Sequence, residues 1–214
     1  MVNEIVLKEA SKEIQGVQVL DKASYIFEHG KIYGISGRNG SGKTMLLRAI
    51  SGLIHLSYGH VAIDGKILHK DIDYPDSIGV LIENPQFWKQ YTGYEVLKLL
   101  ASIKKTADVE DLKEALDRVG LDWHDRRTIR KYSLGMRQRL GIAQAIMEKP
   151  DIILLDEPTN ALDQSGVDEI HKIINEESRR GALVIVASHD KEELEICDEV
   201  LVMDRGRIKA DGEV

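Results

Sequence analysis

Cysteine is almost absent from this sequence of 214 residues, and long hydrophobic runs are missing from it. One cysteine, Cys197, cannot form an internal disulfide bond, and we expect a small buried side chain rather than a reactive thiol. Apolar stretches such as residues 152–155 and 182–187 fall far short of the roughly 18 residues that predict a membrane span. The N-terminal segment lacks the basic end and apolar run of a secretory signal. These absences predict a soluble chain that works in the reducing cytoplasm.

Positive charge is also in short supply. The sequence has 29 Lys and Arg residues against 36 Asp and Glu residues, which gives a net charge of -7. Sequence-independent nucleic-acid binding depends on neutralising phosphates, so this balance argues against nucleic acid as the main partner. An anionic ligand would have to be held by a local site. Repeats, low-complexity tracts and long Pro- or Ser-rich linkers are lacking too, which favours one folding unit.

The order of the expected elements predicts an α/β fold. Its sheet is expected to be mainly parallel, with an N-terminal antiparallel β region and an inserted helical sub-domain. Strands are expected at residues 4–10, 17–27, 31–36, 60–68, 77–82, 151–156, 182–188 and 199–206. Helices are expected at residues 43–53, 93–105, 108–120, from about 135, 166–180 and 191–197. We expect a single domain over residues 1–214, with a core of about 1–83 and 150–214 and a helical sub-domain of about 84–149.

A glycine-rich loop gives the strongest motif. GRNGSGKT fits the pattern G-x-x-x-x-G-K-[ST], and it lies between an expected strand and an expected amphipathic helix, as a P-loop must. The glycines let successive backbone N–H groups point at phosphate oxygens, and the helix adds its positive end. The sequence therefore predicts a triphosphate cradle rather than a chance glycine-rich turn. Its residues are Gly37, Arg38, Asn39, Gly40, Ser41, Gly42, Lys43 and Thr44. Within it, Lys43 would contact the β- and γ-phosphates, and the Thr44 hydroxyl would bind Mg²⁺.

A pair of carboxylates follows a buried strand. DIILLDEP places Asp156 and Glu157 directly after four apolar residues, so the strand would deliver both side chains to the edge of the sheet. Asp156 fits the residue that holds Mg²⁺, usually through water, and Glu157 fits the residue that orients or deprotonates the attacking water. The alternative is structural, with one carboxylate capping the next turn and the other solvated. The P-loop favours the catalytic interpretation.

The motif order resembles the ATPase cassette of ABC transporters over essentially the whole chain. YSLGMRQRL resembles the family's signature, with Ser133 and Gly135 in their usual places, and Leu134 and Met136 where glycine and glutamine are commoner. The resemblance implies that this element contacts the γ-phosphate of ATP held by a second cassette. A bare Ser-x-Gly before a helix would more often be an N-cap.

Three further positions follow from the same resemblance. PTNALD is similar to the D-loop, with Asp163 at the usual position, and His189 is similar to the switch histidine that contacts the γ-phosphate. Ile14 occupies the place where many cassettes carry an aromatic residue over adenine, so the π-stacking contribution would be missing.

The segment GVLIENPQFW resembles the Q-loop region, which joins the core to the helical sub-domain. Glu83 stands where a metal-binding glutamine is usual, and Gln86 is the rival candidate. We expect Glu83 because it immediately follows the expected strand, whereas Gln86 lies beyond Pro85. IENP together with the signature segment is similar to cassettes of bacterial exporters of peptides, antibiotics or lantibiotics.

The sequence thus predicts an ATP-hydrolysing motor subunit of an ABC transporter, with ATP and Mg²⁺ at its site. The resemblance implies a second cassette and separate permease subunits as partners, and a position at the inner face of the cell membrane. An alternative is a soluble ABC-type ATPase of nucleic-acid or translation metabolism, but such proteins usually carry two cassettes or a long coiled-coil insertion. A P-loop GTPase or kinase is disfavoured because no guanine-reading Asn-Lys-x-Asp segment occurs.

Overall fold

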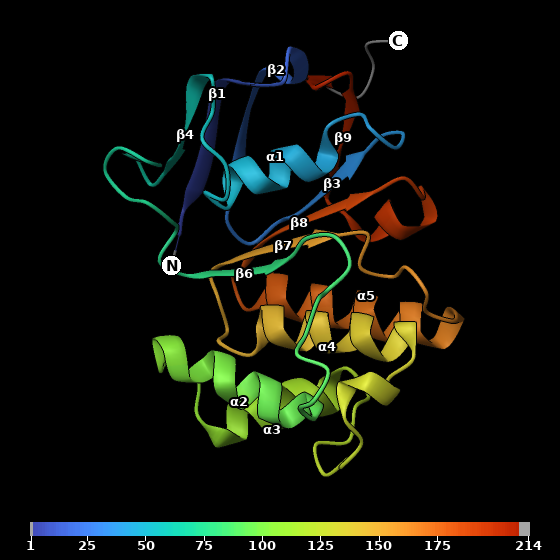
Figure 1. Ribbon diagram of the computed structural model, residues 1–214. Coiled ribbons are helices and arrows are strands. Elements are labelled where there is room, and N and C mark those ends of the chain that lie inside the picture. The colour runs from blue at the N-terminus through green and yellow to red at the C-terminus, as the bar shows by residue number, and fades with distance from the viewer. Residues whose placement is uncertain (1, 210–214) are drawn as a thin grey trace.

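A computed structural model gives the fold of residues 2–209 (Figure 1). The two ends of the predicted domain, Met1 and residues 210–214, lie outside the described residues. The strands are β1 (Glu4–Ile14), β2 (Val17–Glu28), β3 (Ile32–Ser36), β4 (Tyr58–Ile63), β5 (Lys66–Ile67), β6 (Ile78–Leu81), β7 (Ile152–Asp156), β8 (Leu183–Ser188), β9 (Glu199–Asp204) and β10 (Arg207–Lys209). The helices are α1 (Lys43–Ile50), α2 (Gly93–Lys104), α3 (Val109–Arg118), α4 (Leu134–Ile146) and α5 (Gln164–Arg179), with 3₁₀ helices η1 (Ile129–Lys131) and η2 (Glu192–Ile196).

The larger sheet is mainly parallel, which confirms the prediction. Its strand order is β10-β9-β3-β8-β7-β6, and of these neighbours only β10 and β9 pair antiparallel. β7 and β8 are buried along their whole length, which explains why their sequences are apolar without alternation. Ser36 pairs with Ser188, and Asp156 pairs with Ala187. The carboxyl ends of β3, β7 and β8 therefore meet at one edge of the sheet.

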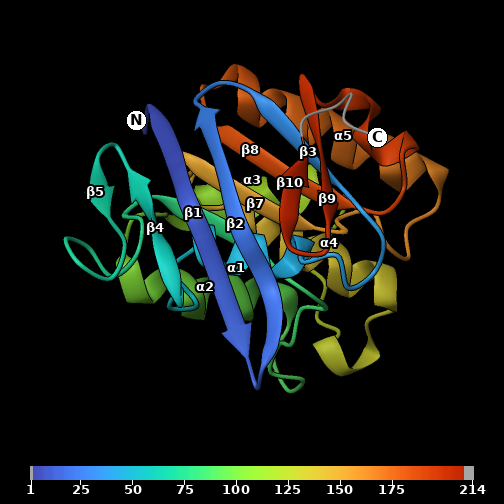
Figure 2. The ribbon, with the colours of Figure 1, turned by 90° about the horizontal axis from the view of Figure 1, so that it is seen from above.

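The N-terminal strands form a separate antiparallel sheet in the order β2-β1-β4-β5, as predicted. Helix α1 lies between the two sheets (Figures 1 and 2). It packs in a core of buried apolar side chains contributed by the antiparallel sheet, α1 and one face of the larger sheet. Members of this core include Ile5, Phe27, Leu46, Leu47, Val61, Ile152 and Ile185.

The opposite face of the larger sheet is covered by α4 and α5, and α2 and α3 lie beyond them (Figure 1). Leu112, Leu116 and Val119, the residues expected to share one face, are all buried in this second core. Thr92 and Asp108 start α2 and α3 with reciprocal capping boxes. Arg118, the last residue of α3, forms ion pairs with Glu176 and Glu177 of α5 and so links α3 to the helix layer that covers the larger sheet.

The structure differs from the sequence prediction at four elements. The expected strand 60–68 is a hairpin of β4 and β5, because the turn at Asp64 and Gly65 has positive φ at both positions. The expected helix 191–197 is the short 3₁₀ helix η2. The strand expected at 77–82 ends at Leu81, so Ile82 separates it from Glu83. β10 was not predicted at all, since three residues carry too little periodicity to be recognised.

Within residues 2–209, none of the helices has the length and apolarity needed to cross a membrane. Cys197 follows η2 and packs against the second core. Burial raises the pKa of its thiol to about 12, in line with the expected inert side chain.

Candidate nucleotide-binding site

The loop between β3 and α1 has a backbone that requires glycine. Gly42 lies at φ 109° directly before α1, and Gly40 lies at φ 79°. A Cβ atom at Gly42 would come within 2.8 Å of the Val19 carbonyl oxygen, and one at Gly37 would come within 2.5 Å of the Met203 carbonyl oxygen. The loop is thus packed tightly against β2 and β9. No side chain caps the start of α1, so its first N–H groups are available to an anion.

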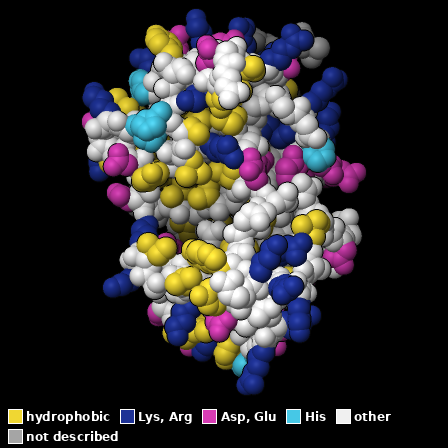
Figure 3. Space-filling model, in the orientation of Figure 1, with side chains coloured by type: hydrophobic (Ala, Val, Ile, Leu, Met, Phe, Trp, Pro, Cys, Tyr) yellow, Lys and Arg dark blue, Asp and Glu magenta, His cyan; other side chains and the backbone are white. Residues whose placement is uncertain are grey.

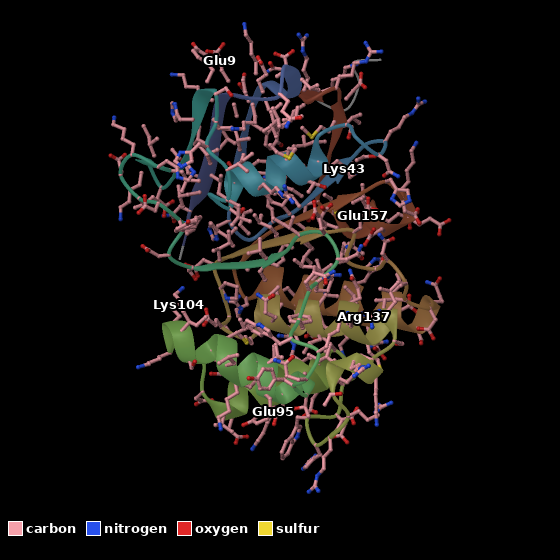
Figure 4. All side chains as sticks on the ribbon, in the orientation of Figure 1. Glu9, Lys43, Glu95, Lys104, Arg137 and Glu157 are labelled. Carbon is pink, nitrogen blue, oxygen red and sulfur yellow. The ribbon has the colours of Figure 1, made fainter. Side chains whose placement is uncertain are left out.

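Lys43 is a buried cation at the start of α1. Its side chain is 6% exposed, and its Nζ donates a hydrogen bond to the Gly37 carbonyl oxygen at 2.7 Å. The same Nζ lies 3.6 Å from Oε1 of Glu157, which comes from the end of β7. Figure 4 shows the two side chains between α1 and the sheet. Glu157 leaves this ammonium incompletely neutralised, because the contact is longer than a charge-assisted hydrogen bond.

Thr44 and Asp156 form a hydroxyl–carboxylate pair. The Thr44 Oγ1 donates to Oδ2 of Asp156 at 2.7 Å. Burial raises the pKa of the Asp156 carboxyl, and the hydrogen bond from Thr44 opposes that rise. The main-chain N–H of Glu83 also donates to this carboxylate. The pair offers two oxygen donors of the kind that Mg²⁺ prefers.

Glu157 is held in a strained and well-defined position. Its φ of 50° lies in the left-handed region, which costs a non-glycine residue about 1 kcal/mol or more and is common at functional sites. Its Oε2 accepts hydrogen bonds from the Ser188 hydroxyl at 3.2 Å and from His189 Nδ1 at 2.8 Å. The backbone N–H of His189 donates to Oε1 at 3.2 Å. Two hydrogen bonds therefore join Glu157 to His189 at the ends of β7 and β8.

Lys43, Thr44, Asp156 and Glu157 lie at a cavity of about 300 Å³ beside the glycine-rich loop. Its lining comes from β2, the glycine-rich loop, α1 and the end of β7, and consists of Val19, Arg38, Asn39, Gly40, Gly42, Lys43, Thr44, Met45, Asp156 and Glu157. The Ser41 hydroxyl is buried nearby and has no partner among the described residues. An unpaired buried hydroxyl, uncapped N–H groups and an incompletely neutralised lysine all fit a phosphate ligand.

The cavity also fits a magnesium ion that accompanies the phosphates. In residues 2–209, no three His, Cys, Asp or Glu side chains are grouped so that they alone would hold a metal ion. Mg²⁺ at a nucleotide site needs only one or two protein oxygens, since phosphates and water supply the others. Thr44 and Asp156 meet that requirement.

Glu83 and Gln86 lie in different surroundings. The Glu83 carboxylate is exposed and accepts a hydrogen bond from Arg48 of α1 at 2.7 Å, while its backbone N–H bonds to Asp156. Gln86 lines a separate groove of about 310 Å³, with Phe87, Lys89, Arg130 and Arg137 among its neighbours. The main chain of Glu83 thus lies near the Thr44–Asp156 pair, and its side chain is turned to α1.

The signature segment lies close to the residues that follow Glu157. Ser133 caps α4 by accepting a hydrogen bond from the Met136 N–H at 3.1 Å, and Asp163 caps α5 by accepting from the Gly166 N–H at 3.2 Å. Both residues are N-caps within one chain, which for Ser133 is the alternative interpretation of a Ser-x-Gly before a helix. A Cβ atom at Gly135 would approach the Ala161 carbonyl oxygen to 2.9 Å, so glycine lets α4 touch the D-loop segment.

Sequence reasoning missed two residues of the site, Gln138 and Val19. Gln138, on the buried face of α4, donates to the Glu157 and Pro158 carbonyl oxygens at 3.0 and 3.1 Å. A glutamine at a core-facing helix position was the available signal. Val19 of β2 lines the cavity, whereas Ile14 is 41% exposed at the end of β1, beside the hairpin turn. Of the described residues, Val19 and not Ile14 is the one from the antiparallel sheet that lines the cavity.

Comparisons with known proteins agree with this geometry. The family model described as "ABC transporter" matches residues 20–160. The chain is 51% identical to the uncharacterized ABC transporter ATP-binding protein YybJ of Bacillus subtilis, over 95% of this chain and 94% of that protein. It is 37% identical to the bacitracin transport ATP-binding protein BcrA of Enterococcus faecalis (97% and 69%), and 32% identical to the lantibiotic transport ATP-binding protein SrtF of Streptococcus pyogenes (83% and 76%).

Solved structures show the same fold. The ATP-binding subunit of an ABC transporter superposes with a TM-score of 0.87 at 25% identity, covering 98% of this chain and 90% of that one. A dimeric bacterial ABC transporter cassette superposes with a TM-score of 0.86 at 24% identity, covering 96% of both chains.

Proposed function

Since the chain belongs to the ABC transporter family and is an ATP-binding subunit that hydrolyses ATP, we propose a role for each site residue and for two kinds of partner. The observation that carries the proposal is the convergence of Lys43, Thr44, Asp156 and Glu157 on one cavity, at the sheet edge where β3 and β7 end on either side of β8. The loop Gly37–Thr44 binds the triphosphate. Lys43 exchanges its contact with Gly37 for the β- and γ-phosphates.

Thr44 and Asp156 are the residues that would hold Mg²⁺, which when bound neutralises phosphate charge during the transfer. Glu157 orients the attacking water and accepts its proton. The hydrogen bond from His189 Nδ1 fixes the carboxylate that accepts this proton and keeps His189 beside the γ-phosphate position. Ile14 would cover the adenine without stacking on it, a contact that stays a prediction.

Two cassettes pack head to tail in the proposed working state. Ser133 and Gly135 of one chain contact the γ-phosphate of ATP on the other, and Asp163 lies at the same interface. Support comes from the exposed end of α4, where Ser133 presents a hydroxyl beside the positive end of a helix. The dimeric cassette that shares this fold provides the geometrical precedent.

Ser133→Asp tests this arrangement, because aspartate caps a helix as well as serine does but places a negative charge against the incoming phosphate. We expect Mg-ATP affinity of the single chain to stay within about twofold and the ATP-dependent dimer to disappear. Analytical ultracentrifugation with Mg-ATP, in a Glu157→Gln background that retains ATP, measures the dimer. Ser102→Asp, on exposed α2, is the matched control. A dimer that forms equally well in both variants would rule out Ser133 as a trans contact.

For the metal site, we propose that Glu83 rather than Gln86 reaches Mg²⁺ when the cassettes close. The support is that the main-chain N–H of Glu83 is close enough to the Asp156 carboxyl to lower its pKa, whereas Gln86 lines the neighbouring groove. The carboxylate has to leave Arg48 for this contact, so the contact is conditional on closure. A negative side chain is attracted by the metal and repelled by the triphosphate, which makes its position depend on bound Mg²⁺.

Titration of ATPase rate against Mg²⁺ checks the assignment. Glu83→Ala is expected to raise the Mg²⁺ concentration for half-maximal rate, Glu83→Gln to retain substantial activity, and Gln86→Ala to behave nearly as wild type. The opposite pattern, with the shift in Gln86→Ala alone, would transfer the role to Gln86.

The second kind of partner is a separate membrane-spanning permease. We propose that the helical sub-domain, about residues 84–149, moves against a core of about 1–83 and 150–214 and passes ATP-driven closure to that permease. The chain would then lie at the inner face of the cell membrane. The names of BcrA and SrtF favour export of a peptide antibiotic or lantibiotic as the cargo class.

A further inference from the structure

Glu193 is a buried carboxylate behind the proposed catalytic residues. Its side chain is 5% exposed, although η2 otherwise carries exposed acidic residues at Glu192 and Glu195. Figure 3 shows acidic side chains at the right of the molecule, at the height of the larger sheet. One pocket is lined by five acidic residues, Asp168, Asp190, Glu192, Glu193 and Glu195. Burial raises the pKa of Glu193, and hydrogen bonds from Ser188 and Thr159 oppose the rise.

The contacts of Glu193 join the two chain segments that hold Glu157. Its Oε1 accepts hydrogen bonds from the Thr159 N–H at 3.1 Å and from the Thr159 hydroxyl at 2.7 Å. Thr159 lies two residues after Glu157, at the start of the D-loop segment. The hydroxyl of Ser188, the residue directly before His189, lies close enough to Glu193 to lower the pKa of that carboxyl. The Glu193 carboxylate therefore contacts the segments that follow β7 and end β8.

Ser188 links the two carboxylates. Its side chain is fully buried, its Oγ contacts Oε2 of Glu157 at 3.2 Å, and the same Oγ accepts the Asp190 N–H at 3.0 Å. A serine hydroxyl has one proton, so it can donate fully to Glu157 or to Glu193 but not to both. The position of Glu193 thus influences the hydrogen bonding of Glu157 without any contact with the nucleotide cavity.

We propose that Glu193 is a positioning residue for ATP hydrolysis, which fixes Thr159 and Ser188 and thereby sets the relative positions of Glu157 and His189. This inference rests on the proposed role of Glu157. It predicts an effect on turnover that is separate from nucleotide binding, because Glu193 does not line the cavity beside the glycine-rich loop.

Glu193→Ala is expected to lower kcat by about 10- to 100-fold and to leave the Kd for Mg-ATP within about twofold. The change removes the acceptor of the Thr159 N–H and hydroxyl, and the carboxylate next to Ser188, at the ends of β7 and β8. Glu193→Gln is expected to keep kcat within about threefold, because the amide oxygen still accepts from Thr159 and the amide group donates to Ser188. When the amide of the Glu193→Gln variant donates to the Ser188 oxygen, the Ser188 hydroxyl can donate its own proton to Glu157. A role that depended on the negative charge alone would make the two variants equally poor.

Steady-state ATPase rates and calorimetric Mg-ATP affinities measure both effects on the full chain. Glu192→Ala and Glu195→Ala are matched controls, since they remove the same charge from the same short helix at exposed positions. Normal kcat in Glu193→Ala, or a loss in the controls of the same size, would overturn the proposal. If Glu193→Ala does not fold, Thr159→Val carries the test, with kcat expected to fall several-fold at unchanged Kd and an unchanged kcat counting against the proposal.

A double-mutant cycle with Ser188→Ala shows whether Glu193 acts through Ser188. Coupled residues give effects on kcat that are clearly less than multiplicative, whereas multiplicative effects would contradict the proposed route. Glu157→Gln in the same assay separates the two hypotheses. If Glu157→Gln hydrolyses ATP normally, the role of Glu157 is wrong; if it is inactive while Glu193→Ala is normal, only the role of Glu193 is wrong.

Discussion

Replacement of Lys43 by alanine is expected to raise the Kd for Mg-ATP by about 10- to 100-fold, because hydrogen bonds to a charged group contribute roughly 1.5–3 kcal/mol. The ammonium is 6% exposed and its two contacts are the Gly37 carbonyl oxygen and Glu157. Neither contact balances a buried charge fully. Triphosphate oxygens provide the missing negative charge, so removal of Lys43 should affect binding before it affects any later step.

Isothermal titration calorimetry with Mg-ATP measures this change. Lys172→Ala is a suitable control, because its side chain on α5 is 79% exposed and pairs with Glu176 only at 3.9 Å. Both variants lose one positive charge, so a general effect of net charge would weaken binding in both. An unchanged affinity in Lys43→Ala would mean that the glycine-rich loop does not bind the triphosphate.

Glu157→Gln is expected to lower the rate of ATP hydrolysis by roughly 100- to 10,000-fold, the range attributed to a general base, while Mg-ATP affinity is retained. Glutamine has the shape of glutamate and still accepts hydrogen bonds from Ser188 and His189 through its amide oxygen. The backbone at φ 50° is equally strained with either residue. The capacity to take a proton from water is lost, together with the acceptor that Oε1 offers to the His189 N–H and the ion pair with Lys43.

Trapped ATP should then hold two chains together. Single-turnover hydrolysis and sedimentation with and without Mg-ATP report the two consequences separately. Glu192→Gln, which changes an exposed carboxylate near the same site, is the control. Wild-type turnover in Glu157→Gln would remove this residue from the chemistry, and a slow enzyme that stays monomeric with Mg-ATP would count against the dimer alone.

The candidate site could be predicted from sequence because its main residues lie in two short segments. Gly37, Lys43 and Thr44 have a fixed spacing between a strand and a helix, and Asp156 and Glu157 follow a continuous apolar run. The carboxyl ends of parallel strands lie at one edge of a sheet, so the segments after β3 and β7 meet there although more than 100 residues separate them. An expected parallel sheet was therefore enough to predict that the glycine-rich loop and the Asp156–Glu157 pair lie close together.

The remaining contacts depend on packing across long sequence separations. Gln138 reaches the Glu157 carbonyl oxygen from 19 residues away, and Glu193 reaches Thr159 from 34 residues away. No local pattern distinguishes Glu193 from the exposed Glu192 beside it, because a five-residue 3₁₀ helix has no clear periodicity. The hairpin of β4 and β5, by contrast, had a local signal that the prediction overlooked, because Asp64-Gly65 is a dipeptide typical of tight hairpin turns.

The partial burial and raised thiol pKa of Cys197 make the chain convenient for site-specific chemistry. Because burial raises the pKa of this thiol, little of it is thiolate at neutral pH, and we expect maleimide reagents to modify the native protein slowly. A cysteine introduced on an exposed surface would then be the dominant reactive group. Single fluorophores or spin labels can be attached without first removing the natural residue, and distances between two labelled chains can be followed as nucleotide is added.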